Sequence, residues 1–343
     1  YPGSNNLNLL YGEGQFGSRL SHEAASPRYI HVKKSEYFSK IFSKEDENIL
    51  IDQYDGDQKI DPNFSLPTIP LLLVNGSLGT GNGFKCNIAS YSIESIYNFL
   101  DEFSKKGKTN KRLVPFVKGF TGNVSKNHDT GQITYSGIIK KINTSTLEIH
   151  ELPPKVEVID YKNHLNKLVD EKVIKDYNNL STEEKCLVEV DCYRETSYLD
   201  EDKILQKFNA VSRDTETIVC WTPEGKLKTY NNVEELLIDW YNYRIEYYEK
   251  FKLYKDKKLN EDLLFRTNKK IFIEYWLDNQ DTLIKMTSND LKEHIANKLG
   301  IEFVDFVNMR LSDLCKDMID SLNKNIDKIK EDIKLNLETK SDK

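Results

Sequence analysis

The chain has 343 residues, of which 38% are hydrophobic and 30% charged, and its formal net charge is -6. This length favours two or three domains, and the acidic balance argues against a protein that only coats nucleic acid. No apolar run reaches the roughly 18 to 20 residues that cross a bilayer. The five cysteines are scattered without a CxxC pair, which indicates neither a disulfide framework nor a zinc site. We therefore expect a soluble, cytoplasmic protein with no membrane partner.

Residues 1–30 mix glycines with polar side chains and are expected to be rich in loops. Within them, Pro27 excludes a regular helix interior and biases Ser26 towards an extended backbone. Arg28 and Tyr29 therefore follow a fixed kink, which can present a side chain outward. Because the chain begins at Tyr1 and ends in a charged run, we expect that upstream sequence is missing.

The next part alternates short strand candidates with turns. Asp55-Gly56 is a turn signal, and the run Leu66–Val74 is predicted to be a buried strand. Residues 75–83 hold four glycines and are predicted to form a glycine-rich loop. A helix is predicted over residues 92–103. Further strands are predicted at 132–139, 146–150, 186–192, 217–221 and 227–230, and helices at 161–170 and 204–208.

The last part is predicted to be helical. Asn232 is a candidate N-cap, and an apolar stripe from Val233 to Tyr254 predicts a helix of about thirty residues. A second stripe, from Ile319 to Ile333, has the alternating spacing of three and four that is typical of a coiled coil. Each stripe needs a partner, most simply the other stripe. Residues 263–314 between them are expected to form a small helical domain.

The candidate chemistry centres on Tyr29. A tyrosine can act as a nucleophile in phosphoryl transfer when its proton is removed. Arg28 beside it and Arg19 can each offer a fork of donors to a phosphate, and the loop that contains Gln15 lets backbone groups approach a ligand closely. Without further context, an ordinary tyrosine would be the better interpretation. A basic cluster at 105–118 could be a phosphate-binding face or a solvated loop.

Several motifs supply that context. Gly3–Leu10, Gly14–Arg19 and Ala24–Ile30 occur in order within thirty residues. More matching segments follow at 61–64, 67–70, 74–76, 147–153 and 225–230. This series resembles the breakage and reunion core of type IIA DNA topoisomerases over nearly the whole chain. The short segment between Arg19 and Ala24 is similar to that of the phage-type enzymes, which would place the protein in a host cytoplasm.

The resemblance implies an α+β multidomain chain. Residues 1–33 would be the C-terminal part of a winged-helix domain, residues 34–231 a tower domain, and residues 232–343 a long antiparallel coiled coil with a helical dimerisation tip at about 263–314. Two chains would form a homodimer through this tip and through the DNA gate, since cutting both strands needs two copies of Tyr29.

The resemblance also implies a reaction. Tyr29, with Arg28 beside it, would attack a phosphate of double-stranded DNA and form a 5'-phosphotyrosyl link, so that a second duplex can pass before the break is resealed. Mg²⁺ would be held by a partner metal-binding domain or subunit, and ATP would be used by a separate ATPase domain or subunit. We assign no metal ligand to this chain, and its sequence has no GxxxxGK[ST] loop.

We expect the DNA-contacting residues to be Arg19, Gln15, His22, Asn75, Thr80 and Lys85. Two features depart from the family. Thr80 stands where the family has an isoleucine that wedges between base pairs, and threonine is a smaller and more polar wedge. The segment before Ala24 is short, so His22 could take over a phosphate contact, although a solvated loop histidine is the simpler interpretation.

Two alternatives remain open. The first is a DNA-binding scaffold that keeps the fold but has lost cleavage, against which Arg28 and Tyr29 both argue. The second is a coiled-coil interaction protein with no role on DNA, which only the helical stripes and the acidic charge support. Salt-dependent binding of duplex DNA would separate the second alternative from the other interpretations.

Overall fold

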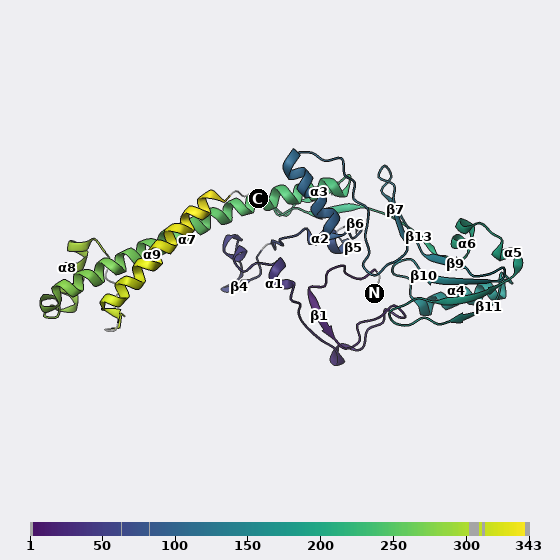
Figure 1. The fold of residues 1–343 in the computed structure, drawn as a ribbon, viewed down its shortest axis with the longest axis horizontal. Coiled ribbons are helices and arrows are strands. Elements are labelled where there is room, and N and C mark those ends of the chain that lie inside the picture. Colours follow the sequence, from purple (N-terminus) through teal and green to yellow (C-terminus); the bar gives the residue numbers. More distant parts are fainter. Residues whose placement is uncertain (1–2, 63, 82, 302–308, 311–312, 340–343) are drawn as a thin grey trace. The chain divides into compact units, whose positions relative to one another are not determined.

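The computed structural model describes residues 3–62, 64–81, 83–301, 309–310 and 313–339 (Figure 1). The chain forms two compact units, Tyr1–Arg244 and Ile245–Lys343, each with buried core residues of its own. The first unit combines helices with antiparallel sheets, which confirms the mixed helix and strand character. The domain boundaries at 33 and 231 and the winged-helix and tower assignments stay predictions.

A short antiparallel ribbon opens the first unit. Strand β1 (Leu10–Glu13) pairs with β2 (His31–Lys34), with Glu13 opposite His31, and the 3-10 helix η1 (Pro27–Tyr29) lies between them in sequence. The elements that follow are α1 (Phe38–Ile41), η2 (Asp46–Ile49), β3 (Gln53–Asp55) and β4 (Gln58–Ile60). Strands β3 and β4 pair around the predicted Asp55-Gly56 turn, where Gly56 has a φ of 60°.

Helix α3 (Ile93–Lys106) confirms the helix predicted from residue 92. The Oγ of Ser92 caps it by accepting a hydrogen bond from the backbone N–H of Ser95 at 3.1 Å. The predicted strand Leu66–Val74 is wrong, because its last part is helix α2 (Leu71–Asn75). Pro70 stands at the N-cap of α2, and its carbonyl accepts hydrogen bonds from the next turn. A short apolar run of this kind does not distinguish a strand from a buried helix.

The glycine-rich stretch is a hairpin rather than a loop. Strand β5 (Ser77–Gly81) pairs with β6 (Phe84–Ile88) in an antiparallel register. A second hairpin, which the sequence predicts, joins β14 (Ile218–Trp221) to β15 (Leu227–Tyr230). An antiparallel bridge between Asn87 and Thr217 connects the two hairpins.

A four-stranded antiparallel sheet carries a second core of the first unit. Its strand order is β11 (Ile174–Asn179), β12 (Val188–Cys192), β10 (Thr146–Glu151) and β9 (Ile138–Lys141). Helix α4 (Val158–Asp170) packs on it through buried Tyr161, Leu165 and Leu168. Nearby in sequence are α5 (Arg194–Ser197) and α6 (Glu201–Lys207).

A three-stranded sheet has the order β13 (Val211–Thr215), β8 (Gln132–Ser136) and β7 (Asn123–Lys126). The single strand predicted over residues 132–139 is therefore two strands, β8 and β9, in different sheets. They are separated at Gly137, whose N–H donates to the carbonyl of Ala210 at 2.7 Å.

Helix α7 (Val233–Leu283) begins in the first unit and continues into the second. The predicted cap is present, since the side-chain oxygen of Asn232 accepts from the backbone N–H of Glu235 at 2.8 Å. The helix is 51 residues long, so the predicted length of about thirty is wrong. Its one non-helical residue is Asn279.

The second unit adds α8 (Ser288–Leu299) and α9 (Lys316–Glu338). Helix α9 lies antiparallel to α7, because Lys252 Nζ donates to the carbonyl of Leu337 at 3.0 Å while Leu322 shares a buried core with Phe272. Helix α9 thus packs on the part of α7 that follows Lys252, whereas Val233 and Leu237 at the start of the first stripe join a core of the first unit. The predicted pairing of the two stripes is therefore wrong for most of the first stripe, and a coiled coil with a dimerisation tip stays a prediction. Residues 302–308 and 311–312 of the predicted tip lie outside the described residues. None of the described helices combines the length and apolar composition that a membrane crossing requires.

A buried polar network joins separate parts of the first unit. Lys126 Nζ lies 2.6 Å from Glu216 Oε2, and these two side chains are only 3% and 4% exposed. Glu216 also accepts hydrogen bonds from the hydroxyl of Tyr91 at 2.8 Å and the backbone N–H of Ala89 at 3.0 Å. Burial and the neighbouring Glu216 carboxylate raise the pKa of Tyr91 well above its usual value. Because each charge is paired, removing one partner leaves the other buried without compensation.

We expect Glu216→Ala to lower the free energy of unfolding by about 3–5 kcal/mol, since the ammonium of Lys126 would lose its counter-charge inside the protein. Urea unfolding would measure this. The matched control is Lys105→Ala, which removes an exposed ion pair with Asp101 and should lower the free energy of unfolding far less than Glu216→Ala does. The double variant Lys126→Met/Glu216→Leu should be more stable than Glu216→Ala, and equal losses in all three proteins would contradict the network.

Candidate functional site

Tyr29 stands at the end of η1 and is 70% exposed. Ser26 before this turn is extended, with φ -53° and ψ 138°, and its carbonyl accepts from the N–H of Tyr29 at 2.9 Å. Pro27 occupies the first position of the turn, where its missing N–H costs nothing. The guanidinium carbon of Arg28 lies 5.5 Å from the centroid of the Tyr29 ring. The expected outward presentation of Tyr29 is confirmed, and the structure places a cation beside it.

Two glycines hold the preceding loop against this turn. A Cβ on Gly14 would lie 2.8 Å from Ile30 Cγ2, and one on Gly17 would lie 2.7 Å from the carbonyl oxygen of His22. Both glycines also have positive φ values, of 107° and 92°. The N–H of Ala25 donates to the carbonyl of Gln15 at 3.0 Å, which closes the loop. The glycines of the Gly14–Arg19 motif are therefore required by close packing within the chain itself.

Arg19 anchors this loop and does not face solvent. Its guanidinium forms a buried ion pair with Glu151, in which the side chains are 3% and 6% exposed, and donates to the carbonyl of Leu152 at 3.0 Å. Glu151 also accepts from the N–H and the hydroxyl of Thr121, at 3.1 and 2.9 Å. The expected phosphate contact by Arg19 is thus corrected, because a phosphate cannot reach a guanidinium that is enclosed and paired.

His22 also turns towards the protein. Its Nδ1 lies 3.5 Å from Glu157 Oε1, and its backbone N–H donates to Glu157 Oε2 at 3.0 Å. The side chain is 19% exposed, so it is not the solvated histidine considered from the sequence, and its phosphate contact stays a prediction. Leu20 adds a backbone hydrogen bond to Ile159 at 3.1 Å. Residues 19–22 therefore tie the loop of Tyr29 to the start of α4 and the end of β10.

Asn75 has a structural role as well. Its side-chain oxygen accepts from the N–H of Leu7 at 2.9 Å, and its side-chain nitrogen donates to the carbonyl of Leu7 at 3.0 Å. The amide therefore pairs with the N-terminal segment as a neighbouring strand would. The structure thus gives Asn75 a structural partner that the sequence analysis did not foresee, and its expected DNA contact stays a prediction.

The other expected contacts remain accessible. Thr80 and Lys85 are opposite each other in the β5–β6 register, and both are exposed, as is Gln15. The hairpin thus brings together two residues that the sequence singled out separately. Gly79 and Gly81 flank Thr80, and a Cβ on either would meet no atom within 4 Å. Direct contact of Gln15, Thr80 and Lys85 with DNA stays a prediction.

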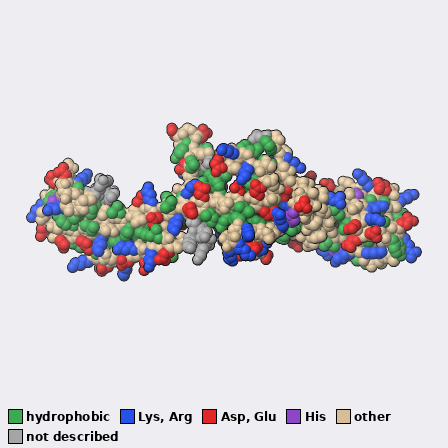
Figure 2. Space-filling view, turned by 90° about the horizontal axis from the view of Figure 1, so that it is seen from above, with side chains coloured by type: hydrophobic (Ala, Val, Ile, Leu, Met, Phe, Trp, Pro, Cys, Tyr) green, Lys and Arg blue, Asp and Glu red, His purple; other side chains and the backbone are tan. Residues whose placement is uncertain are grey.

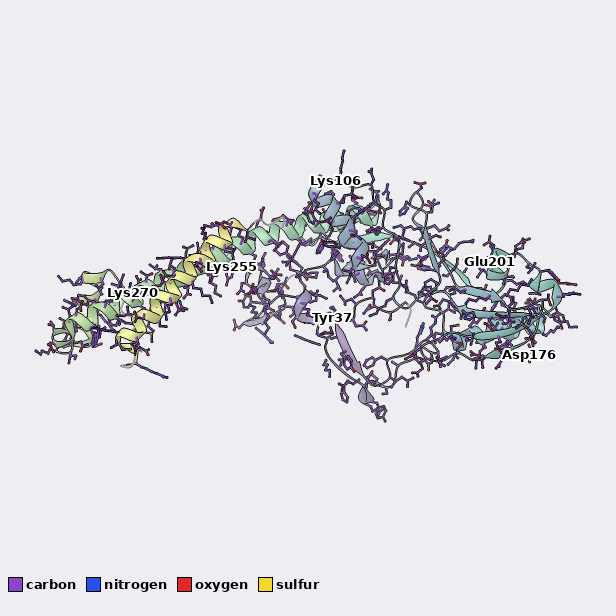
Figure 3. The ribbon with its side chains drawn as sticks, viewed as in Figure 1. Tyr37, Lys106, Asp176, Glu201, Lys255 and Lys270 are labelled. Carbon is purple, nitrogen blue, oxygen red and sulfur yellow. The ribbon has the colours of Figure 1, made fainter. Side chains whose placement is uncertain are left out.

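The basic cluster at 105–118 is largely neutralised by neighbouring acids. Lys105 lies 2.7 Å from Asp101, and Lys106, at the end of α3 in Figure 3, lies 2.8 Å from Glu102. Lys111 lies 3.7 Å from the same glutamate. On the face seen in Figure 2, basic and acidic side chains are interspersed over much of the surface. This favours the solvated interpretation of the cluster over a phosphate-binding face.

Basic residues that the sequence analysis did not single out lie on β2. Lys33 lies 2.9 Å from Glu13 and Lys34 Nζ lies 4.5 Å from the ring centroid of Phe38. The hydrogen bond that Lys33 donates to the Glu13 carboxylate raises the pKa of Lys33. The consecutive pair Lys33-Lys34 soon after Tyr29 could have identified these basic residues from the sequence. Glu151, in contrast, left no signal, because its partner Arg19 is 132 residues away in sequence.

The described residues bring together no group of three histidine, cysteine, aspartate or glutamate side chains that could hold a metal ion. The guanidinium of Arg28 lies beside Tyr29, and two lysines follow in sequence on β2. This arrangement can attract and orient an anionic ligand such as a phosphate next to a phenol hydroxyl.

An exposed tyrosine beside an arginine, on a glycine-held turn of a multi-sheet α+β unit, is the arrangement expected of a type IIA topoisomerase breakage and reunion core. Comparison with known proteins confirms that class. The profile of the DNA gyrase/topoisomerase IV A-subunit family matches residues 2–343, and the chain belongs to this family.

Similar proteins include a viral one. The chain is 30% identical to DNA topoisomerase 2 of Invertebrate iridescent virus 6, over 97% of this chain and 30% of that protein. It is 34% identical to DNA topoisomerase 2 of Plasmodium falciparum (isolate K1 / Thailand), over 87% of this chain and 22% of that protein. The chain thus spans less than a third of the length of these curated relatives.

A solved structure has the same fold. The crystal structure of the Plasmodium falciparum topoisomerase II DNA-binding, cleavage and re-ligation domain matches with a TM-score of 0.88 and 28% identity. The match covers 99% of this chain and 51% of that chain. The architecture described above is therefore that of the family.

We expect Arg19→Met to loosen the loop that carries Tyr29, because the buried Glu151 carboxylate would lose its counter-charge. Hydrogen exchange should accelerate at least about tenfold at the amides of Ser18 and Ala25, which close the loop. Lys33→Met, which removes an exposed ion pair with Glu13, is the matched control and should leave these amides unchanged. Unchanged protection in Arg19→Met would show that the ion pair does not hold the loop.

Proposed function

We propose that this chain is the DNA breakage and reunion core of a type IIA DNA topoisomerase and that Tyr29 is its nucleophile. The observation that carries the proposal is the exposed Tyr29, held beside Arg28 by an anchored loop in a chain of this family. An alternative scaffold without cleavage is not favoured, because the tyrosine, the arginine and the loop are all present.

The reaction would exchange one phosphate ester for another. The hydroxyl oxygen of Tyr29 attacks a phosphorus atom of the DNA backbone as its proton leaves, and the bond from phosphorus to the 3'-oxygen breaks. The product is a 5'-phosphotyrosyl link together with a free 3'-hydroxyl, which takes up a proton. Attack by this hydroxyl on the link reverses the step and releases Tyr29. Because the ester bond is conserved, resealing needs no ATP.

Arg28 would act on the phosphate. Its planar guanidinium can donate two parallel hydrogen bonds to phosphate oxygens and can stabilise the charge that develops on them in the transition state. The contact with the Tyr29 ring keeps the guanidinium next to the attacking residue. The lysines of β2 would add attraction for the DNA backbone that weakens as salt concentration rises.

The hairpin β5–β6 would meet the DNA elsewhere. Thr80 stands at the family's wedge position, and Lys85 opposite it can neutralise a phosphate. A threonine wedge buries little apolar surface, so we infer that the bend depends more on backbone contacts than in an enzyme with isoleucine.

The divalent metal would be bound, and ATP hydrolysed, by other domains or subunits. The described residues do not fit a metal site, so no step is assigned to a metal here. We infer that Mg²⁺ is held by a metal-binding domain or subunit, where it would stabilise charge on the phosphate. ATP would be used by an ATPase domain or subunit, and the site of action would be the cytoplasm, where the DNA is.

We also infer a homodimer. Each Tyr29 can attack one strand, so a double-strand break requires two chains related by a twofold axis. The DNA gate and the tip carried by α7 and α9 would be the two contact regions. A second duplex would then pass through the opened first one.

We expect Tyr29→Phe to abolish the covalent protein–DNA product, because the attacking oxygen is absent, while duplex DNA binding changes less than about twofold. The assay combines the full-length chain with its metal-binding partner and supercoiled plasmid, followed by detergent and protease treatment.

Tyr37→Phe is the matched control for this assay, since Tyr37 is also exposed, at 43%, and lies near Tyr29 in sequence. It should cleave as the unaltered protein does. Equal cleavage by Tyr29→Phe would remove Tyr29 from the reaction, and binding without cleavage by every protein would favour the scaffold.

A further inference from the structure

Two cysteines from distant parts of the sequence share one face of the paired hairpins. Cys86 lies on β6 and Cys220 on β14. The antiparallel bridge between Asn87 and Thr217 sets the register, so Cys86 stands opposite Ile218 and Cys220 lies two residues further along. Residues two apart on a strand point to the same face. Both thiols accordingly pack, partly buried, against the same hydrophobic core.

The same two side chains line an open cavity of about 430 Å³ next to the β5–β6 hairpin. Trp221, another residue of its wall, is 60% exposed, so solvent reaches the cavity. On the other side of β6, Cys86 stands opposite Gly79, which has no side chain to cover it. A small oxidant therefore has both a path to the thiols and room beside them.

The two thiols also influence each other. Burial, and then the neighbouring thiol of Cys86, raise the pKa of Cys220 to about 12. Cys220 thus keeps its proton at neutral pH, and we assign the first attack on an oxidant to the Cys86 sulfur, which Gly79 leaves uncovered. In the second step the Cys220 sulfur must lose this proton, which the departing hydroxide of the sulfenic acid takes up as the two sulfurs join.

We propose that Cys86 and Cys220 are a redox-sensitive pair that forms a reversible disulfide when a hydroperoxide reaches the cavity. The Cys86 thiolate attacks one peroxide oxygen, the O–O bond breaks, and a sulfenic acid forms while the leaving oxygen takes a proton and departs as an alcohol or water. The Cys220 sulfur then attacks the sulfenic sulfur and releases water. Two thiols lose two electrons in total, and the hydroperoxide gains them.

Strand geometry makes this disulfide easy to reverse. Diagonal neighbours across two antiparallel strands have Cα atoms about 7–8 Å apart, whereas a disulfide needs about 4.4–6.8 Å. Formation therefore draws β6 towards β14, and the strained bond is readily reduced. Because β6 carries Lys85 and pairs with the strand of Thr80, the bond would restrain the hairpin that we expect to bend DNA. This consequence rests on the proposed function, whereas disulfide formation does not.

The test uses the full chain treated with hydrogen peroxide, quenched and digested without reduction for mass spectrometry. We expect a peptide pair joined through Cys86 and Cys220, and a fall in the number of titratable thiols from five to three that dithiothreitol reverses. Cys86→Ser and Cys220→Ser should each abolish the pair. Cys315→Ser, in the second unit, is the control and should keep it. Absence of this peptide pair, or a bridge to another cysteine, would overturn the proposal.

A second measurement separates the chemistry from its consequence. DNA bending, followed by energy transfer between dyes at the two ends of a short duplex, should fall at least twofold on oxidation and stay unchanged in Cys86→Ser. If the disulfide forms but bending is unaffected, the link to the hairpin is refuted while the redox pair stands. Because the disulfide is detected without cleavage, failure of the Tyr29 assay would leave this result intact.

Discussion

The buried ion pair between Arg19 and Glu151 anchors the loop that carries Tyr29. Tyr29 itself is mostly in solvent and has few contacts that could position it. Its loop leaves the four-stranded sheet at Arg19, and there the guanidinium meets a carboxylate that three further donors hold in place. A mobile nucleophile would lose much of the advantage of orientation. The loop of Tyr29 is therefore anchored by a residue whose own guanidinium is enclosed by the protein.

Charge is used in two different ways in this acidic protein. Inside, Lys126 with Glu216 and Arg244 with Asp46 connect elements that lie far apart in sequence. Such pairs stabilise one arrangement because any other leaves a charge buried alone. Outside, three lysines of the 105–118 segment are paired with acids of α3, whereas Arg28 lies beside Tyr29. A net negative charge is thus compatible with a local attraction for DNA.

The sequence predicted best where a local signal decides the structure. Ser92 and Asn232 mark their helix starts by capping, and the Asp55-Gly56 turn gives its hairpin. The sequence-based prediction failed where contacts with distant residues decide the structure. An example is the glycine-rich stretch, which forms the paired strands β5 and β6. For Arg19, residue type suggested contact with DNA, but its distant partner Glu151 holds it inside the protein. Tyr29 could be proposed as the nucleophile from the sequence because its motif is contiguous.

Gly79 and Gly81 are present for a different reason from Gly14 and Gly17. At Gly14 and Gly17 a larger residue would collide with neighbouring atoms of the same chain. At 79 and 81 the backbone is not in the left-handed region, and an added methyl group would meet nothing in the chain. Folding alone would thus tolerate alanine at either position. Glycine is an advantage at these positions only when another molecule approaches the backbone closely. We therefore infer that this hairpin is shaped to bind a separate molecule.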